Sequence, residues 1–374
     1  MPNVPNVLVV GGGAAGCAAA ILFARDGAAV DLIEIKPDLS ALGSGITVQG
    51  NALRVLRQLG VWDEVAATGY AFNTVGLRAP DGALLVEMED VRTGGPDLPA
   101  TVGMYRPTLA RILADAAAAA GAKLRYATTV RSFSQDADGV DVTFSDGTVS
   151  RYDLVIGADG VRSRVRSLLG IELETRPTGM GIWRVFTSRP ASVTRTDLYY
   201  RGACYIAGYC PTGDESLYAY LVEDAQDRAG LAPAERLAVM RELASHYHGP
   251  WDDIRDRMTD PGTINYTRFE SHLLQPPWNR GRVVLIGDAA HTCPPTIAQG
   301  AAMALEDAAA LADVLLAADR LDQDAFDAFT ARRYDRVKTV VAESVQLGQW
   351  MLDGVEGNVA ALMGKVMAVV SQPA

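Results

Sequence analysis

The fold of this chain is decided near its N-terminus by the stretch VLVVGGGAAG, residues 7–16. The continuous apolar run Val7–Val10 is typical of a parallel strand that is buried on both faces. An alanine-rich segment follows the glycines as far as about Asp26, and Val30–Ile35 returns as a second apolar run. The order strand, glycine turn, helix, strand predicts a βαβ unit and, with it, a Rossmann-like parallel sheet.

The glycines of this stretch have the spacing G-x-G-x-x-G, at Gly11, Gly13 and Gly16. In a βαβ unit the first permits a tight turn, the second lets a pyrophosphate approach the backbone, and the third lets helix and strand pack closely. The helix N-terminus around Ala15 adds free N–H donors, and Glu34 follows where a ribose-binding carboxylate is expected. The motif predicts a dinucleotide site at these five residues without distinguishing FAD from NAD. The alternative is a purely structural glycine turn.

From about residue 178 the chain changes to aromatic-rich, strand-like segments, and two long helical patterns end it. We therefore predict an α/β fold with a Rossmann-like cofactor domain, an inserted, mainly antiparallel β-sheet substrate domain, and C-terminal helices. The predicted boundaries are 1–177 and 270–345 for the discontinuous cofactor domain, 178–269 for the substrate sheet, and 346–374 for a C-terminal helical segment, with 72–100 contributing strands to the substrate side. Residues 130–150 are expected to form one hairpin around Asp146-Gly147.

Composition excludes several classes of partner and site. A net charge of −11 argues against nucleic acid, because phosphate binding needs a basic face. No segment approaches the roughly 20 apolar residues of a membrane span, and no signal peptide is recognisable before the first strand. The four cysteines and four histidines show no metal-ligand or disulfide spacing. We expect a cytoplasmic protein without metal or membrane contact, whose redox chemistry would come from an organic cofactor.

Two later motifs identify that cofactor. They are DLVIGADGVRSRVR at residues 153–166 and GRVVLIGDAAH at residues 281–291, the latter continued by PPTIAQG at 294–300. In this order and spacing the three motifs resemble the group A flavoprotein monooxygenases, the para-hydroxybenzoate hydroxylase family. The segment 298–301 is locally similar to 2-methyl-3-hydroxypyridine-5-carboxylate oxygenase, although many family members carry glycine where this chain has Ala298.

The resemblance implies non-covalently bound FAD and gives several residues a role in holding it. Asp288, after Gly287, matches the aspartate that binds the ribityl chain. Gly300, Ala301 and Ala302 match the helix start whose amides face the flavin pyrimidine edge. Asp159 and Gly160 match the motif shared by FAD and the nicotinamide, and Arg106 matches the arginine that reaches the flavin.

Simpler interpretations of several motif residues stay open. Asp159 could cap a turn, and Ser163, Arg164 and Arg166 could be surface groups. His291 is expected to be a structural hydrogen-bonding residue, and Cys293 a small neighbour of the flavin instead of a redox thiol.

By the same resemblance, NAD(P)H reduces FAD, O₂ adds to give a flavin C4a-hydroperoxide, and a small hydroxylated aromatic or heteroaromatic, acidic substrate is hydroxylated. Pro295 would form a rigid turn beside the flavin. The alternatives are a related flavoenzyme performing epoxidation, halogenation or oxidation, and a non-catalytic FAD-binding protein. A monomer or a homodimer is expected.

Substrate-binding candidates come from the aromatic-rich sheet. Ile182, Arg184 and Phe186 would share one face of a strand. Arg184 is our candidate for pairing a substrate carboxylate or phenolate, since the guanidinium fork matches carboxylate geometry. Tyr205 and Tyr218 are candidates for hydrogen bonds to a ring hydroxyl. The alternatives are a surface salt bridge for the arginine and sheet packing for the tyrosines.

Overall fold

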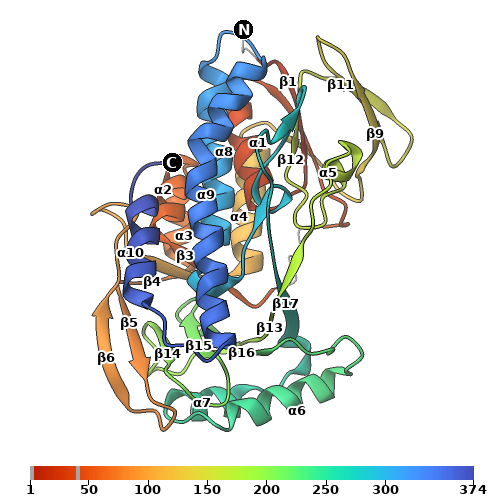
Figure 1. The fold of residues 1–374 in the computed structure, drawn as a ribbon. Coiled ribbons are helices and arrows are strands. Elements are labelled where there is room, and N and C mark those ends of the chain that lie inside the picture. The colour runs from red at the N-terminus through yellow and green to blue at the C-terminus, as the bar shows by residue number, and fades with distance from the viewer. Residues whose placement is uncertain (1–3, 39–42) are drawn as a thin grey trace.

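The computed structural model describes residues 4–38 and 43–374 and is drawn in Figure 1. A six-stranded sheet has the strand order β18 (Asn279–Arg280), β19 (Val283–Leu285), β12 (Leu154–Gly157), β1 (Asn6–Val10), β2 (Ala29–Ile33) and β8 (Lys123–Arg125). Its strands pair in parallel, except that the edge strand β18 is antiparallel to β19. The predicted parallel sheet and its βαβ unit are confirmed.

Helix α1 (Ala14–Arg25) packs directly on β1 and β2 of this sheet. The helices around it are α2 (Gly50–Gln58), α4 (Arg106–Ala119), α8 (Gly300–Ala317) and α9 (Gln323–Leu352). Helix α1 packs between α8 and α4, and α9 lies against α8. The alanines of α1 are buried almost all round, because their small side chains let three helices and a sheet approach closely. This packing fixes the N-termini of α1 and α8 beside the ends of the central strands.

The second large sheet has eight strands. Its order is β20 (His291–Thr292), β17 (Ile264–Leu273), β13 (Arg176–Ser188), β16 (Ser216–Asp224), β15 (Ile206–Pro211), β14 (Thr196–Tyr199), β5 (Thr74–Arg78) and β6 (Leu84–Glu89). All neighbours are antiparallel except β14 and β5. The predicted fold class is confirmed. The predicted domain boundaries remain a prediction; β17 runs through residue 269 and α9 through residue 345.

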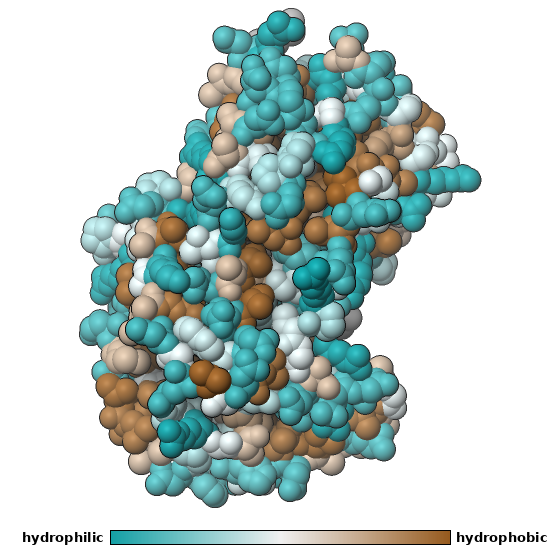
Figure 2. All heavy atoms as spheres, in the orientation of Figure 1, coloured by the Kyte–Doolittle hydropathy of each residue, from teal (hydrophilic) through white to brown (hydrophobic). Residues whose placement is uncertain are grey.

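One face of the large sheet is closed by α6 (Pro233–Ala244) and α7 (Pro250–Arg257), which bury an aromatic core around Trp183, Tyr209 and Trp251. The opposite face turns toward the six-stranded sheet (Figure 1). Figure 2 shows the surface hollowed between the part of the molecule that holds the six-stranded sheet and the part that ends in α6 and α7. The remaining helical elements are α3 (Trp62–Thr68), α5 (Arg164–Leu168), α10 (Val359–Val370), η1 (Pro261–Thr263), η2 (Gly287–Ala289) and η3 (Pro295–Ile297).

Two small sheets complete the fold, and one corrects an expectation. Strands β3 (Gly45–Gln49), β7 (Thr101–Tyr105) and β4 (Tyr70–Phe72) form one of them. Residues 130–150 are not one hairpin: β9 (Val130–Gln135), β10 (Val140–Phe144) and β11 (Val149–Tyr152) form two. The missed turn is built by Asp136, whose carboxylate accepts hydrogen bonds from the backbone N–H groups of Asp138 and Gly139. In the described residues, every helix is too short or too polar to cross a membrane.

Candidate functional site

The glycine turn after β1 has the geometry of a pyrophosphate cradle. Gly11 has φ +108°, and a Cβ there would lie 2.4 Å from the carbonyl oxygen of Ala158. At Gly16 a Cβ would lie 1.9 Å from the carbonyl oxygen of Gly11. At Gly13, the N-cap of α1, no atom lies within 4 Å of that position. Two glycines are therefore required by close backbone packing, and the third borders open space at a helix N-terminus, where a phosphate is favoured.

Glu34 follows β2 and braces this turn. Its Oε2 accepts a hydrogen bond from the backbone N–H of Gly12 at 2.8 Å, and its Oε1 accepts one from that of Lys36 at 3.0 Å. A carboxylate has about four acceptor positions, so two remain for another donor. The structure places Glu34 against the glycine turn, where the sequence predicts a ribose-binding acid.

Asp288 lies in η2, directly after β19, and its side-chain carboxylate has no hydrogen-bond donor among the described residues. Burial raises the pKa of this carboxyl group, while His291 and Arg106 lie close enough to oppose the shift electrostatically. This half-buried carboxylate has no donor among the described residues, so its oxygens can accept hydrogen bonds from a ligand. A polyhydroxyl chain such as the ribityl group of FAD would supply hydroxyl donors.

The neighbouring Gly287 adopts φ +58° and donates its backbone N–H to Asp307 at 2.9 Å. His272 supports the same turn from β17: its Nε2 donates to the carbonyl oxygen of Asp288 at 3.0 Å, and its Nδ1 accepts from Thr175 at 2.8 Å. Burial, chiefly, lowers the pKa of His272 to about 4. Both contacts suit a neutral imidazole that fixes the backbone of Asp288.

The N-terminus of α8 is a second helix end that faces open space. Ala298 has φ +54°, a left-handed conformation that explains why glycine is common at this position in the resembling family. Gly300 opens the helix, and no atom lies within 4 Å of a Cβ built on it. The amides of Gly300, Ala301 and Ala302 belong to the first turn, whose N–H groups have no partner within the helix. They can therefore receive a group that carries partial negative charge.

Three features of the described residues fit FAD: an open cradle at α1, a carboxylate at the end of β19 that has no donor among them, and amides at the start of α8 that have no partner within the helix. All three lie at the carboxyl ends of parallel strands or at the helices packed on them, where α/β sheets bind ligands. The individual cofactor contacts remain predictions.

A buried polar network beneath α8 was not found from the sequence. The Nε2 atom of His291 contacts Asp307 at 2.6 Å, and Arg333 of α9 donates to Asp307 at 2.8 Å and to Glu306 at 3.1 Å. All four side chains are almost fully buried. Because Asp307 also accepts the N–H of Gly287, the network holds the Asp288 turn, and His291 has a structural hydrogen-bonding position as expected.

A second arm of this network reaches the start of α8. Asn51 of α2 donates to Gln299 at 2.9 Å and to Glu306 at 3.2 Å, and Gln299 also bonds Gln49 of β3. Arg336 donates to Glu306 at 2.7 Å and to the carbonyl oxygen of Gln372 at 2.8 Å. Buried amides and charges scattered over four elements give no local sequence signal, so only the fold reveals them.

The Asp159 side chain is hydrogen-bonded to the protein's own backbone. The carboxylate of Asp159 accepts hydrogen bonds from the backbone N–H groups of Arg164 and Val165 at 2.7 and 3.0 Å, so it caps α5. Gly160 has φ +81° and open space at its Cβ position. Arg166 is no surface group, because it is buried and donates to the carbonyl oxygen of Ala289 at 2.8 Å. Capping accounts for Asp159, and its role toward FAD or the nicotinamide stays a prediction.

On the large sheet, Arg184 lies on the face opposite the aromatic core. It is in register with Tyr220, and Phe186 with Tyr218, so these side chains share the face. The guanidinium of Arg184 donates to the hydroxyl of Thr267 at 2.8 Å, and no carboxylate of the described residues forms an ion pair with it. Burial and the nearby Arg106 lower the pKa of Arg184 to about 10.

Arg106 lies close to both Asp288 and Arg184. It opens α4, and its side chain runs along Gly43, where an added Cβ would lie 3.0 Å from the Cδ of Arg106. Its charge acts on both Asp288 and Arg184. Neither arginine forms an ion pair within the described part of the chain, and two guanidinium groups near each other favour an anion between or beside them.

The predicted tyrosines lie in different places. The hydroxyl of Tyr218 is 2.7 Å from that of Thr47 on β3, and its ring packs on Gly45. Tyr205 instead donates to Asp224 at 2.8 Å, at the far end of β16. Six residues separate Tyr218 from Asp224 on that strand, or about 20 Å. The structure brings Tyr218 together with Arg184 and does not bring Tyr205 there.

Cys293 and Pro295 lie in the segment that joins β20 to α8. Pro295 is exposed and begins η3, whose Thr296 hydroxyl is tied to the carbonyl oxygen of Ser344 at 2.7 Å. Burial raises the pKa of the Cys293 thiol to about 12, so the thiol stays protonated and unreactive at neutral pH. This agrees with a packing role for Cys293.

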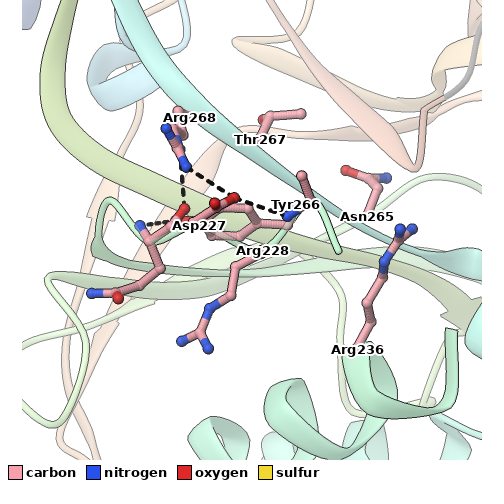
Figure 3. A pocket seen from close by; sticks show the side chains of 9 residues that line it. Asp227, Arg228, Arg236, Asn265, Tyr266, Thr267 and Arg268 are labelled. Carbon is pink, nitrogen blue, oxygen red and sulfur yellow. Dashed lines mark hydrogen bonds and ion pairs between the residues drawn. The ribbon is translucent and has the colours of Figure 1, made fainter. Parts of the chain in front are cut away.

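A cavity of about 480 Å³ is lined by residues of β17, of the segment after β16 and of α6 (Figure 3). Arg228, Arg236 and Arg268 line it, but Arg228 is paired with Glu223 at 3.1 Å and Arg268 with Asp227 at 3.3 Å. Thr267 also lines the cavity and accepts the hydrogen bond of Arg184, so the cavity borders the site. Two of its three arginines are thus neutralised, and Arg236 donates to the carbonyl oxygen of Leu231 at 3.0 Å.

Known proteins share this architecture over nearly its full length. A family model described as an FAD binding domain matches residues 5–344. The chain is 31% identical to the aurachin C monooxygenase/isomerase of Stigmatella aurantiaca, over 92% of this chain and 90% of that protein. It is 32% identical to the 6-hydroxynicotinate 3-monooxygenase of Pseudomonas fluorescens, over 91% and 90%. The tetrameric form of 2-methyl-3-hydroxypyridine-5-carboxylic acid oxygenase superposes with a TM-score of 0.81 at 26% identity, covering 98% and 95% of the two chains.

Proposed function

Because the chain belongs to the family of FAD-binding monooxygenases, we propose that it hydroxylates a small, acidic, hydroxylated aromatic or heteroaromatic compound with NAD(P)H and O₂. The observation that carries the proposal is Arg184, a cation that has no carboxylate partner among residues 4–38 and 43–374 and lies on the face of the large sheet that turns toward the six-stranded sheet. Relatives named for oxygenating 6-hydroxynicotinate, a hydroxylated heteroaromatic acid, support the same substrate class.

When bound, FAD would supply the redox and oxygen-transfer chemistry, which no side chain can perform. The chain's own residues hold and orient it. Gly13 leaves room for the pyrophosphate at the N-terminus of α1, and Asp288 accepts hydrogen bonds from the ribityl hydroxyls. The first amides of α8 stabilise negative charge on the pyrimidine edge, since a helix N-terminus favours an anion.

The substrate would be oriented by residues on the face of the large sheet that carries Arg184. The planar guanidinium of Arg184 binds the carboxylate in a bidentate manner, which fixes both the position and the direction of the ring. Tyr218 and Thr47 form a hydroxyl pair beside it that can exchange a hydrogen bond with a ring hydroxyl. Burial raises the pKa of Tyr218, so its hydroxyl stays protonated and acts as a donor. Phe186 and Tyr220 on the same face exclude water from the ring.

A panel of hydroxylated benzoates, nicotinates and pyridine carboxylates tests the proposal directly. The expected result is NAD(P)H oxidation that is stimulated by one subset of acids and coupled to a hydroxylated product. Each acid should be compared with its uncharged amide, which keeps the ring and loses the anion. Equal turnover of acid and amide would remove the assigned role of Arg184. Absence of turnover across the panel would overturn the proposed substrate class.

A further inference from the structure

Helices α2 and α8 start next to each other, yet only one of the two starts is capped by the protein. The residues that precede them, Gln49 and Gln299, are hydrogen-bonded to each other. In the first turn of α2, the backbone N–H of Asn51 donates to the hydroxyl of Thr93 at 2.9 Å. At the start of α8, the N-cap side chain makes no hydrogen bond to the helix, and no atom lies within 4 Å of a Cβ built on Gly300. Among the described residues, the first amides of α8 are thus left without the side-chain acceptor that a helix N-terminus usually has.

The side chain of Gln299 is held away from its own helix by two other amides. Its Nε2 donates to the Oε1 of Gln49 and, at 3.3 Å, to the Oδ1 of Asn51. Its Oε1 accepts a hydrogen bond from the Nδ2 of Asn51 at 2.9 Å. Both N–H donors of Gln299 are therefore used, and the residue is fully buried. These three residues form a three-amide cluster, which prevents Gln299 from capping α8.

The three-amide cluster also holds the backbone immediately before α8. The Nε2 of Gln49 donates to the carbonyl oxygen of Ile297 at 3.0 Å. The next residue, Ala298, has φ +54° and ψ +32°, a left-handed conformation that is unfavourable for residues with a Cβ. Such a conformation persists only where the surrounding structure holds it. Gln49 thus fixes the carbonyl group on one side of Ala298 and the side chain of Gln299 on the other.

Glu306 anchors the three-amide cluster to the body of α8. The Nδ2 of Asn51, which bonds Gln299, also donates to the Oε1 of Glu306 at 3.2 Å. Gln299 and Glu306 lie about two helical turns apart, so Asn51 bridges two positions on one face of α8. Arg333 and Arg336 donate to Glu306 in turn, at 3.1 and 2.7 Å. The first turn of α8 is therefore fixed relative to α2 and β3.

We propose that the three-amide cluster raises the reduction potential of bound FAD by keeping the first amides of α8 open toward the flavin. This role rests on the proposed function, in which these amides face the pyrimidine edge of FAD. Reduced FAD carries negative charge at that edge and oxidised FAD does not, so open helix amides stabilise the reduced form more. Without the cluster, the side-chain oxygen of Gln299 would be free to accept hydrogen bonds from these amides and to compete with the flavin. Gln49, Asn51 and Gln299 are positioning residues, because they act through the start of α8.

The experiment compares the reduction potential of FAD in the wild-type protein and in Gln49→Leu, which removes the donor to Ile297 and the acceptor for Gln299. The affinity for reduced FAD should fall at least about tenfold more than the affinity for oxidised FAD, which lowers the two-electron potential by about 30 mV or more. Anaerobic titration with a redox dye measures the potential, and fluorescence titration of apoprotein measures the affinity for oxidised FAD. General loosening of the protein would weaken both forms alike and leave the potential unchanged. Gln58→Leu is the control, because Gln58 is an exposed glutamine at the other end of α2, and both values should stay at the wild-type level.

A second substitution tests the part played by the backbone. Glycine adopts the left-handed conformation without support, so Gln49→Leu combined with Ala298→Gly should recover at least about half of the lost potential. Ala298→Gly alone should keep the wild-type potential. Gln299→Met removes the same side-chain hydrogen bond from the other partner and should lower the potential in the same direction as Gln49→Leu.

Three outcomes would overturn the proposal. They are an unchanged potential in Gln49→Leu and Gln299→Met proteins that hold FAD, a double variant with the same potential as Gln49→Leu, and a wild-type protein that binds no FAD. The last would overturn the FAD site as well. No substrate takes part in these measurements, so their outcome is independent of which compound the enzyme oxygenates.

Discussion

The proposed cofactor side and the proposed substrate side of this protein are built in different ways. On the proposed cofactor side the candidate contacts come from the backbone of short segments that follow strands: Gly11, Gly13 and the first amides of α8. On the substrate side, Arg184, Thr267 and Thr47 come from three strands that are far apart in sequence. The cofactor half is therefore defined by local geometry, and the substrate half only by the packing of distant strands. Changes on the first side should affect FAD, and changes on the second should affect substrate alone.

The largest effect should follow from closing the pyrophosphate cradle. Gly13 has φ −74° and ψ −176°, a conformation open to any residue, and its side-chain position faces open space. Gly13→Val should therefore fold normally and lower FAD affinity by at least about 1,000-fold, equivalent to roughly 4 kcal/mol. The measurement is FAD titration of apoprotein by fluorescence quenching.

Gly364→Ala is the control for that experiment, because it also fills open space but lies on α10, away from the cradle. It should bind FAD as the wild type does. A folded Gly13→Val protein with wild-type FAD affinity would show that the pyrophosphate lies elsewhere.

A pH-dependent loss of stability should originate on the cofactor side. Burial lowers the pKa of His272 to about 4 from its usual 6.5, so the unfolded chain takes up this proton more readily than the folded one. Stability from this group is complete above pH 6.5 and is lost as the pH falls toward 4, by about 3 kcal/mol in total. Urea unfolding at pH 7.5 and pH 4.5 measures it.

His272→Gln keeps a donor and an acceptor without titrating and should flatten the pH profile. His246→Gln, at an exposed histidine, should keep the wild-type profile. If His272→Gln loses as much stability on acidification as the wild type, the loss arises from other groups.

On the substrate side, Arg184→Met should change substrate binding and leave FAD content unchanged. Losing a charge-assisted hydrogen bond costs roughly 1.5–3 kcal/mol, which corresponds to an increase in KM on the order of 10- to 150-fold. Oxidation of NAD(P)H should also become less coupled to product as water enters. Arg184→Lys keeps the charge without the fork and should fall between the two. An unchanged KM in Arg184→Met would separate this residue from the substrate.

Tyr218→Phe should produce the smallest change. It removes one hydroxyl of the pair with Thr47 and keeps the ring packed on Gly45, at a cost of about 0.5–1.5 kcal/mol. We expect a KM increase of at most about tenfold for substrates that carry a ring hydroxyl and none for those that lack it. Equal changes for both kinds of substrate would indicate a packing role for Tyr218.

The same contrast explains what could be predicted from the sequence. The βαβ unit, the glycine turn and the Asp288 turn were predicted because each is encoded within about thirty consecutive residues. The strand Ile264–Leu273, which carries Thr267 and His272, was not predicted because polar and charged residues interrupt it and leave no continuous apolar run. Arg184 could be assigned to the correct face by alternation alone. Tyr205 could not be placed, since sequence alternation does not show where along a strand the site lies.

The buried polar cluster beneath α8 could not be predicted from the sequence for a related reason. Asn51, Gln299 and Glu306 form one hydrogen-bonded cluster, yet they come from positions about 250 residues apart. Nothing in an isolated asparagine distinguishes a surface residue from a member of such a cluster.

The central proposal is that one atom of O₂ is transferred to an aromatic ring that Arg184 orients beside bound FAD. Its most direct test is turnover of the best acid from the panel under ¹⁸O₂ in ordinary water, with the product analysed by mass spectrometry. We expect one ¹⁸O atom, in the new hydroxyl group of the product, for each NAD(P)H consumed in coupled turnover. Product oxygen that comes from water, or NAD(P)H oxidation that yields only hydrogen peroxide with every acid, would contradict it.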